Sequence, residues 1–413
     1  MENSVKTQDI PTMSLPYELL RDIFRQATFI PHEWDVNYTS IVPGLFCMWD
    51  QFQVPAWKEV LPLRRAIAHV SRTWRALSLE FLYGTFHDDD KGRSIESFAS
   101  ILLDCPYYGT LVKRLTIRVT GEPEHDARVA GIMLKCSNLL IIDIHDTPIN
   151  GGSGLFTVAD LTLFSTTIRQ LGVANVPMST VFAIIIYLQN LEILSIKLML
   201  DSDWTPTPLI VLPNLRILQF ISPYSAPVDM YMRSLKVPRL SALSINICAI
   251  PQWVPRLPND MAKRLLCLEF IYPFENIRGW DAGDLPNLRC LRLRWRHLKS
   301  DLFRSQLPMK QIVELTCDLA PFEDNNLSTY QSHFERIMSF TLDPNSMPNL
   351  KFFILNLYYA TRDLLRRKDQ RGRGVREYFM GLIAAFDRRG VDLYCYPGNQ
   401  LHGKILIRDI LEA

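Results

Sequence analysis

The chain has 413 residues, and its 48% hydrophobic content is typical of a folded protein with a large core. Its 45 basic and 43 acidic side chains give a net charge of +2, so no long-range field favours nucleic acid or an acidic membrane as a partner. The polar N-terminal residues lack the apolar core of a secretion signal, and no apolar run approaches the roughly 18 residues of a membrane span. We therefore expect a cytoplasmic or nuclear protein.

The first predicted element is a short amphipathic helix over residues 15–27, LPYELLRDIFRQA. Apolar side chains, among them Leu19, Ile23 and Phe24, recur there at spacings of three and four residues, and charged residues fill the other positions. Glu18 stands where the positive end of the helix dipole favours a carboxylate. The spacing alone leaves open whether this is an ordinary core helix or one with another task.

The segment that follows, residues 28–62, is rich in prolines and aromatics without a stable period, and it is predicted to be an inserted loop. After it, the stretch RRAIAHVSRTWRALSLEFLYGTF over 64–86 places apolar side chains at helical spacing, including Val70 and Trp74. Two or three helices are therefore expected between residues 64 and 86.

The middle of the chain repeats one motif, apolar-x-x-apolar-x-apolar, often after Pro-Asn or a similar turn pair, as in LPNLRILQF and LPNLRCLRL. The first apolar anchors of its ten copies are Val112, Leu139, Ile168, Leu191, Leu215, Leu240, Leu265, Leu288, Ile312 and Leu350. Eight of the nine intervals lie between 23 and 29 residues, a period that indicates leucine-rich repeats. Each unit is expected to give one short strand whose anchors point inward, and the return segment packs on the next unit.

The last interval is 38 residues long, and the stretch 331–340 inside it is predicted to be helical. An amphipathic helix is predicted over 375–390, ending at Gly390, with the stretch VDLYCY behind it as a last strand. This helix and strand are expected to shield the open end of the repeats.

The predicted fold class is α/β, with an N-terminal helical module followed by an irregular solenoid of short parallel strands with helical or loop returns. The predicted parts are a flexible tail over 1–12, a helical module over 13–86 with the inserted loop, a linker helix over 87–106, and the solenoid with its C-terminal cap over 107–413. The return segments vary in length and are rich in proline, so the repeats are expected to be irregular.

The chain shows no constellation of residues that suggests catalysis. Phosphate-binding glycine loops and the common hydrolase and metalloprotease motifs are absent from the sequence. Its eight cysteines and eight histidines do not fall at metal-ligand spacing. We therefore expect no enzyme activity, no cofactor and no metal.

The stretch LPYELLRDIF, followed by AHVSRTWRALS and LEFLY, resembles the F-box. The order of F-box, linker helix and irregular leucine-rich repeats is similar to that of F-box proteins expanded in mushroom-forming fungi. The elements that carry the resemblance occur in the right order: Leu15, Pro16, Glu18, Leu19, Ile23, Phe24, Val70, Ser71, Trp74 and Tyr83. The sequence departs from the family pattern in its insertion, in Ser71 where Cys is commoner, and in Tyr83 where Trp often ends the motif.

The resemblance implies a substrate receptor of an SCF-type cullin-RING ubiquitin ligase. The F-box would dock on the SKP-type adaptor, and the repeats would hold a target protein whose identity the sequence does not give. The residues expected to contact the adaptor are Leu15, Pro16, Leu19, Ile23 and Val70, while Phe24 and Trp74 are expected to hold the helices together. The alternative is that all of them belong to an internal core. Outside the complex the chain is expected to be a monomer, with neither nucleic acid nor membrane as a partner.

For target binding, the inner face of the solenoid is the expected surface. On one register it presents Arg118, Asp143, His145, Lys197, Gln219, Asn246, Glu269, Arg292, Arg294 and Asp318. The densest candidate cluster is Arg292, Arg294, Trp295 and Arg296, since Arg and Trp are favoured interface anchors. The alternative is an ordinary solvated strand face. Two other functions stay open: a repeat scaffold without a ligase role, and an enzyme with its site on the inner face.

Overall fold

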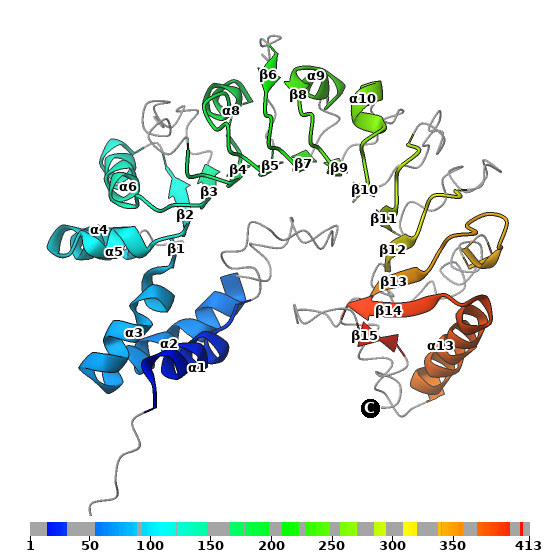
Figure 1. Cartoon of the computed structure of the whole chain (residues 1–413), viewed down its shortest axis with the longest axis horizontal. Helices are drawn as coiled ribbons and strands as arrows, with labels where there is room; N and C mark the ends of the chain where they lie inside the picture. Colours follow the sequence, from blue (N-terminus) through cyan, green and yellow to red (C-terminus); the bar gives the residue numbers. More distant parts are fainter. Residues whose placement is uncertain are drawn as a thin grey trace, which may run out of the picture.

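The computed structural model describes residues 15–30, 54–88, 93–120, 122–146, 166–176, 178–197, 209–222, 228–247, 257–270, 285–294, 309–319, 338–339, 341–357, 370–396 and 405–407. These residues form a mixed α/β fold around one large, mostly parallel sheet, which confirms the predicted fold class at this level. The sheet curves into an arch, with helices along its outer side and the N-terminal helices at one end (Figure 1).

The main sheet has 13 strands whose lateral order follows the chain, and neighbouring strands are parallel except for the last pair. Its strands are β1 (Thr85–His87), β2 (Arg114–Val119), β3 (Ile141–Asp146), β4 (Gln170–Ala174), β5 (Ile193–Lys197), β7 (Ile217–Ser222), β9 (Ala242–Ile247), β10 (Cys267–Phe270), β11 (Cys290–Arg294), β12 (Glu314–Leu319), β13 (Phe352–Leu357), β14 (Asp392–Tyr396) and β15 (Ile405–Leu406). Two further short strands, β6 (Ile210–Val211) and β8 (Leu235–Lys236), pair with each other on the outer side (Figure 1).

The strands place most of their apolar side chains on the outer face of the arch because side chains alternate between the two faces of a strand. A smaller apolar row on the inner face consists of Ile193, Ile217, Ala242 and Cys267. In β7, Leu218 and Phe220 are fully buried in the main core, and Gln219 between them belongs to the inner face. The same alternation repeats from β2 to β14 and joins the repeats in one continuous core. The ten predicted anchors are all buried, so their inward orientation is confirmed.

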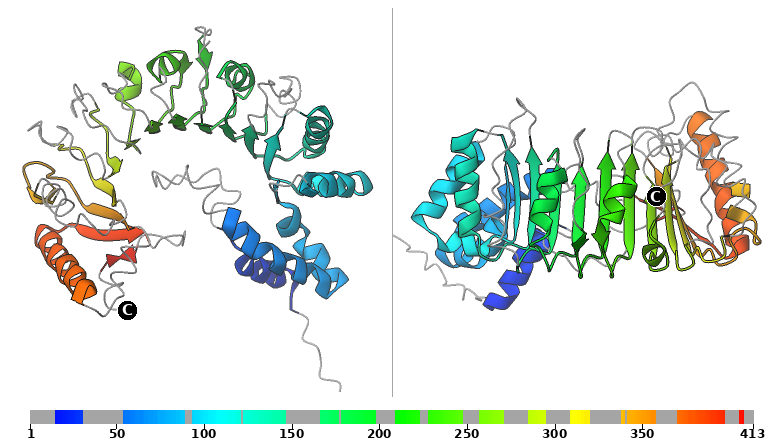
Figure 2. Two further views of the ribbon diagram at one scale, coloured as in Figure 1. Left: turned by 180° about the vertical axis from the view of Figure 1, so that it is seen from behind. Right: turned by 90° about the horizontal axis from the view of Figure 1, so that it is seen from above.

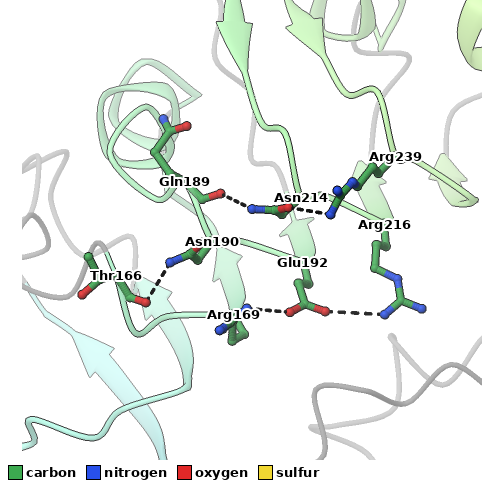
Figure 3. Close-up of polar contacts among 8 residues, drawn as sticks. All are labelled: Thr166, Arg169, Gln189, Asn190, Glu192, Asn214, Arg216 and Arg239. Carbon is green, nitrogen blue, oxygen red and sulfur yellow. Dashed lines mark hydrogen bonds and ion pairs between the residues drawn. The ribbon is translucent and has the colours of Figure 1, made fainter.

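A hydrogen-bonded turn precedes each strand and joins it to the repeat before. In five of these turns an Asn side chain donates to a main-chain oxygen of the preceding turn: Asn138 to Thr110, Asn190 to Thr166, Asn214 to Gln189, Asn287 to Lys263, and Asn349 to Lys310. The distances lie between 2.6 and 3.0 Å, and Figure 3 shows two consecutive steps. The Asn of the Pro-Asn pairs therefore joins successive turns by a hydrogen bond, a role that the spacing of these pairs in the sequence does not indicate.

The helices on the outer side are α4 (Arg93–Asp104), α5 (Tyr107–Leu111), α6 (Pro123–Lys135), α8 (Met178–Ile185), α9 (Val228–Arg233), α10 (Asn259–Ala262) and α13 (Gln370–Arg389). Figure 2 shows them on the side of the sheet away from the centre of the arch. Three more helices form the N-terminal module: α1 (Tyr17–Ala27), α2 (Val54–Val70) and α3 (Arg72–Tyr83).

Two predicted boundaries are wrong. Helix α2 begins at Val54, inside the segment predicted as a loop over 28–62, because Pro62 is tolerated within the helix at an exposed position. The sheet begins with β1 at residues 85–87, before the linker predicted over 87–106 and the solenoid predicted from 107. The buried Phe86 of β1 joins the main core. Within the predicted linker, α4 is helical as expected.

The C-terminal helix and strand form as predicted, with α13 starting five residues earlier, at Gln370. Gly390 ends the helix with a positive φ of 70°, and the N–H of Val391 reaches back to the carbonyl of Phe386. Of the helix predicted over 331–340, Met338 and Ser339 are described, and both are helical. The predicted tail over 1–12 lies outside the described residues.

Candidate functional site

The N-terminal module has a small apolar core of its own. Phe24 of α1, Ile67 of α2 and Phe81 of α3 are buried against one another, and the ring of Trp74 lies 4.8 Å from that of Phe24. A three-helix module of this size has too little volume to enclose every apolar side chain. The expected internal role of Phe24 and Trp74 therefore agrees with their positions.

Polar contacts fix the helix ends of this module. Ser71 caps α3, because its hydroxyl oxygen accepts the N–H of Trp74 at 3.1 Å. At the end of α1, the buried Arg64 donates from Nη2 to the carbonyl oxygen of Thr28 at 2.9 Å. The Ser71 bond fixes the start of α3, and the Arg64 bond holds the end of α1 against α2, so the outward side chains of α1 have a defined direction.

The outer side of the module carries exposed apolar side chains. Leu15, Leu19 and Ile23 are 49%, 51% and 49% exposed, and Val70 at the end of α2 is 60% exposed. Leu19 and Ile23 are one helical turn apart and point away from the core, whereas Phe24 points into it. The four side chains, together with exposed Pro16, are the residues expected to contact an adaptor.

Sequence reasoning missed two further exposed apolar residues of the same helices. Tyr17 opens α1 and is 62% exposed, and Leu63 lies in α2 with 43% exposure. The sequence of α1 could have indicated that Tyr17 is exposed. The helix has more apolar residues than one packed face can bury, so some of them have to lie on its outer side. Leu63 directly follows the residues predicted as a loop, and their lack of a helical period hides the helix to which Leu63 belongs.

The module is joined to the sheet through Glu80 of α3. Glu80 forms an ion pair with Arg21 of α1, and its other carboxylate oxygen accepts from Lys113, just before β2, at 2.8 Å. Partial burial raises the pKa of the Glu80 carboxyl, but hydrogen bonds and charges from Lys113 and Arg21 outweigh this and leave it below its usual value. Glu80 thereby fixes the orientation of α1 relative to the sheet.

Stacked rings and main-chain bonds complete this junction. Tyr83 of α3 stacks on Tyr108 of α5 with a ring distance of 4.4 Å and an angle of 11°. The carbonyl of Gly84 accepts both the Lys113 and Arg114 N–H groups, at 2.8 and 3.0 Å. The module therefore continues into the sheet without a hinge among the described residues of the junction.

The inner face of the arch was the second predicted site. The strand register aligns Thr116, Asp143, Gly172, Ser195, Gln219, Ser244, Glu269, Arg292 and Thr316 in one row across the sheet. Most of this row is buried, and its polar groups have partners: Asp143 accepts from the neighbouring Arg114 of β2 at 2.6 Å, and within the row Ser195 donates to Gln219 at 2.8 Å. The row is therefore chiefly structural.

Of the predicted target-binding cluster, the structure describes the side chain of Arg292, and its position does not fit the predicted anchor role. Arg292 is 4% exposed, and its Nε lies 3.2 Å from Oε1 of the buried Glu269 on the neighbouring strand. A buried, paired guanidinium is not free to anchor a partner. The Arg294 side chain and the whole of Trp295 and Arg296 lie outside the described residues, so their predicted role stays a prediction.

The same part of the inner face holds two neighbouring thiols, Cys267 and Cys290, on β10 and β11. Burial, together with the hydrogen bond and charge of Cys290, raises the pKa of the Cys267 thiol well above its usual value. A thiol held in its protonated form is a poor nucleophile and metal ligand. Cys267 therefore gives no support to thiol chemistry at this place on the inner face.

Comparison of the sequence with protein-family models and with curated proteins finds no match. None of the described helices has both the length and the apolar character needed to cross a membrane.

Proposed function

We propose that the N-terminal helices are an F-box that docks on the SKP-type adaptor of a cullin-RING (SCF) ubiquitin ligase. The curved sheet is an irregular leucine-rich-repeat solenoid that holds a target protein, and the chain acts as a substrate receptor without catalytic residues of its own. In this role it works in the cytoplasm or the nucleus.

The observation that carries the proposal is the division of apolar residues in α1 and the two residues before it. Leu15, Leu19 and Ile23 are about half exposed, although a solvent-facing helix side is normally polar. Phe24, next to Ile23, is 2% exposed. A side chain of Leu or Ile gains about 1.5–3 kcal/mol when it is fully buried, so this face favours contact with another apolar surface.

The solenoid part of the proposal is supported by the regularity of the arch. Strands lie side by side in chain order, one buried anchor precedes each of ten strands, and an Asn bond links five pairs of successive turns. Each unit contributes its apolar face to a shared core, as repeat proteins do.

Co-purification of the full chain with a SKP-type adaptor tests the proposal. A one-to-one complex is expected with the wild type, and the double substitution Leu19→Ala with Ile23→Ala is expected to weaken it by about 100-fold, because two interface side chains lose most of their buried area. The matched control is Leu103→Ala with Leu134→Ala, which removes exposed apolar side chains from α4 and α6.

The control variant is expected to bind as the wild type does. If the wild type forms no complex, or if both variants bind equally, the F-box assignment is wrong, and a repeat scaffold without a ligase role becomes the better interpretation.

A further inference from the structure

One edge of the arch is strongly basic, although the chain as a whole is nearly neutral. This edge consists of the four residues immediately before each of the strands β4, β5, β7, β9, β10, β11, β12 and β13. They include eight basic side chains, Arg169, Arg216, Arg239, Lys263, Arg264, Arg289, Lys310 and Lys351, and a single acidic one, Glu192. We call this surface the basic edge.

Only part of this charge is neutralised locally. Glu192 lies between Arg169 and Arg216, with distances of 3.0 and 3.5 Å to their guanidinium nitrogens (Figure 3). The other six basic side chains are exposed, and within the described part of the chain none of them forms an ion pair. Arg239 contacts only a neutral group there, the side-chain oxygen of Asn214, at 2.9 Å.

The main chain beneath these side chains is held in place. Asn287 bonds to the carbonyl of Lys263, and Asn349 to that of Lys310, so the turns that carry the charges are fixed to one another. A surface whose backbone is already ordered loses less conformational entropy when it binds a partner. The basic edge is therefore arranged in advance for a ligand that runs along it.

We propose that the basic edge binds an extended acidic segment of a partner protein. Neighbouring strands are about 4.8 Å apart, so the unneutralised charges from the turn before β9 to that before β13 span about 20 Å. An extended peptide covers that length with about six residues at 3.3 Å each. A short run of Asp and Glu side chains thus matches the edge in charge and in length.

Residue chemistry favours an acidic peptide over nucleic acid or a membrane. The eight turn segments contain no Phe, Trp, Tyr or His. Single-stranded nucleic acids are bound with stacking aromatic side chains, and interfacial membrane binding uses Trp, Phe or Leu beside the charges. The Leu residues of these segments are mostly buried anchors, so the edge exposes cations beside Pro, Asn and Gln on ordered turns, which suits carboxylates. This inference does not depend on adaptor docking.

Fluorescence anisotropy of a fluorescein-labelled deca-glutamate peptide with the full chain tests the proposal, at an ionic strength of about 0.05 M where screening is weak. The edge variant carries Lys263→Gln, Arg264→Gln, Arg289→Gln and Lys310→Gln. The control variant removes the same charge from exposed positions of α2 and α3, with Lys58→Gln, Arg65→Gln, Arg72→Gln and Arg75→Gln.

The edge variant is expected to bind the peptide at least about tenfold more weakly than the wild type, since several exposed ion pairs are lost, while the control keeps its affinity. Unfolding in urea checks that both variants are folded, and the smaller variant Lys263→Gln with Arg264→Gln should show about half of the effect on a logarithmic scale. The proposal fails if the wild type does not bind the peptide, or if edge and control variants lose affinity equally. It also fails if a thymidine oligonucleotide or phosphatidylserine vesicles bind the basic edge more tightly than the peptide does.

Discussion

At the residue scale, the charged pair Glu269–Arg292 shows how a polar side chain on a strand can serve the fold. Both residues lie on the inner face, yet they are 1% and 4% exposed. Each charge would be costly to bury alone, and the contact between them offsets that cost. The pair therefore belongs to the internal structure of the arch, and its value can be measured through stability.

Replacing Arg292 by Met is expected to destabilise the protein by about 3–5 kcal/mol, because it leaves the Glu269 carboxylate buried without its cation. The double change of Arg292→Met with Glu269→Leu is expected to recover most of this loss, because no buried charge remains. Urea unfolding of the two variants measures both effects. A single variant as stable as the wild type would contradict the structural role of the pair.

At the element scale, the turn before each strand does more than reverse the chain. In five of these turns an Asn side chain donates to a carbonyl of the previous turn, so those repeats are attached to their neighbours outside the sheet as well as within it. Each turn also presents its remaining side chains along one edge of the arch. The basic edge exists because this turn recurs with the same geometry.

Asn287→Ala is expected to lower the free energy of unfolding by about 0.5–1.5 kcal/mol, the usual net value of one hydrogen bond. Asn214→Ala is expected to cost up to about twice as much, because Asn214 both donates to Gln189 and accepts from Arg239. The two sites are three repeats apart and share no contact, so the losses should add in the double variant. Urea unfolding of the singles and the double provides the measurement. As a control, Asn345→Ala removes an exposed Asn whose side chain makes no cross-repeat bond of this kind.

At the scale of the whole molecule, the helical module and the arch behave as one connected unit. Glu80 joins α1 and α3 to the start of β2, and the stacked Tyr83 and Tyr108 join α3 to α5. In the proposed receptor, this connection sets the direction in which a bound target faces the ligase. The junction is also the place where acid should loosen the molecule.

Because the folded-state pKa of Glu80 lies below its value in the unfolded chain, its contribution to stability is present above the ordinary carboxyl pKa. It is lost as the pH falls through the folded-state pKa. Glu80→Gln should therefore be less stable than the wild type at neutral pH, by about 1 kcal/mol or less. The difference should disappear in acid, which urea unfolding at a series of pH values would show. The exposed Glu59→Gln is the matched control, and an equal pH dependence in both variants would contradict the role of Glu80.

Much of the architecture follows from local patterns in the sequence. The anchors from Val112 to Leu350 define the repeats because an apolar side chain at a fixed place in each unit has to be buried. The exposure of Ile23 and the burial of Phe24 follow from the helical period, because adjacent residues of a helix point in different directions. The predicted boundaries were wrong at two places for two different reasons. Pro62 suggested that no helix runs through this position, but tertiary packing maintains α2 there. The three residues of β1 were too few to show a strand pattern.

The sequence by itself determined the class of fold, the strand that each repeat contributes, and the apolar residues that α1 leaves outside its core. Only the tertiary structure decided which charges meet across repeats: Glu269 with Arg292, Glu192 with Arg169 and Arg216, and Glu80 with Lys113. The reason is physical. A pattern along one strand or helix fixes the direction of a side chain, but contact between residues more than twenty positions apart depends on the lateral register of neighbouring elements, which packing of the whole core sets.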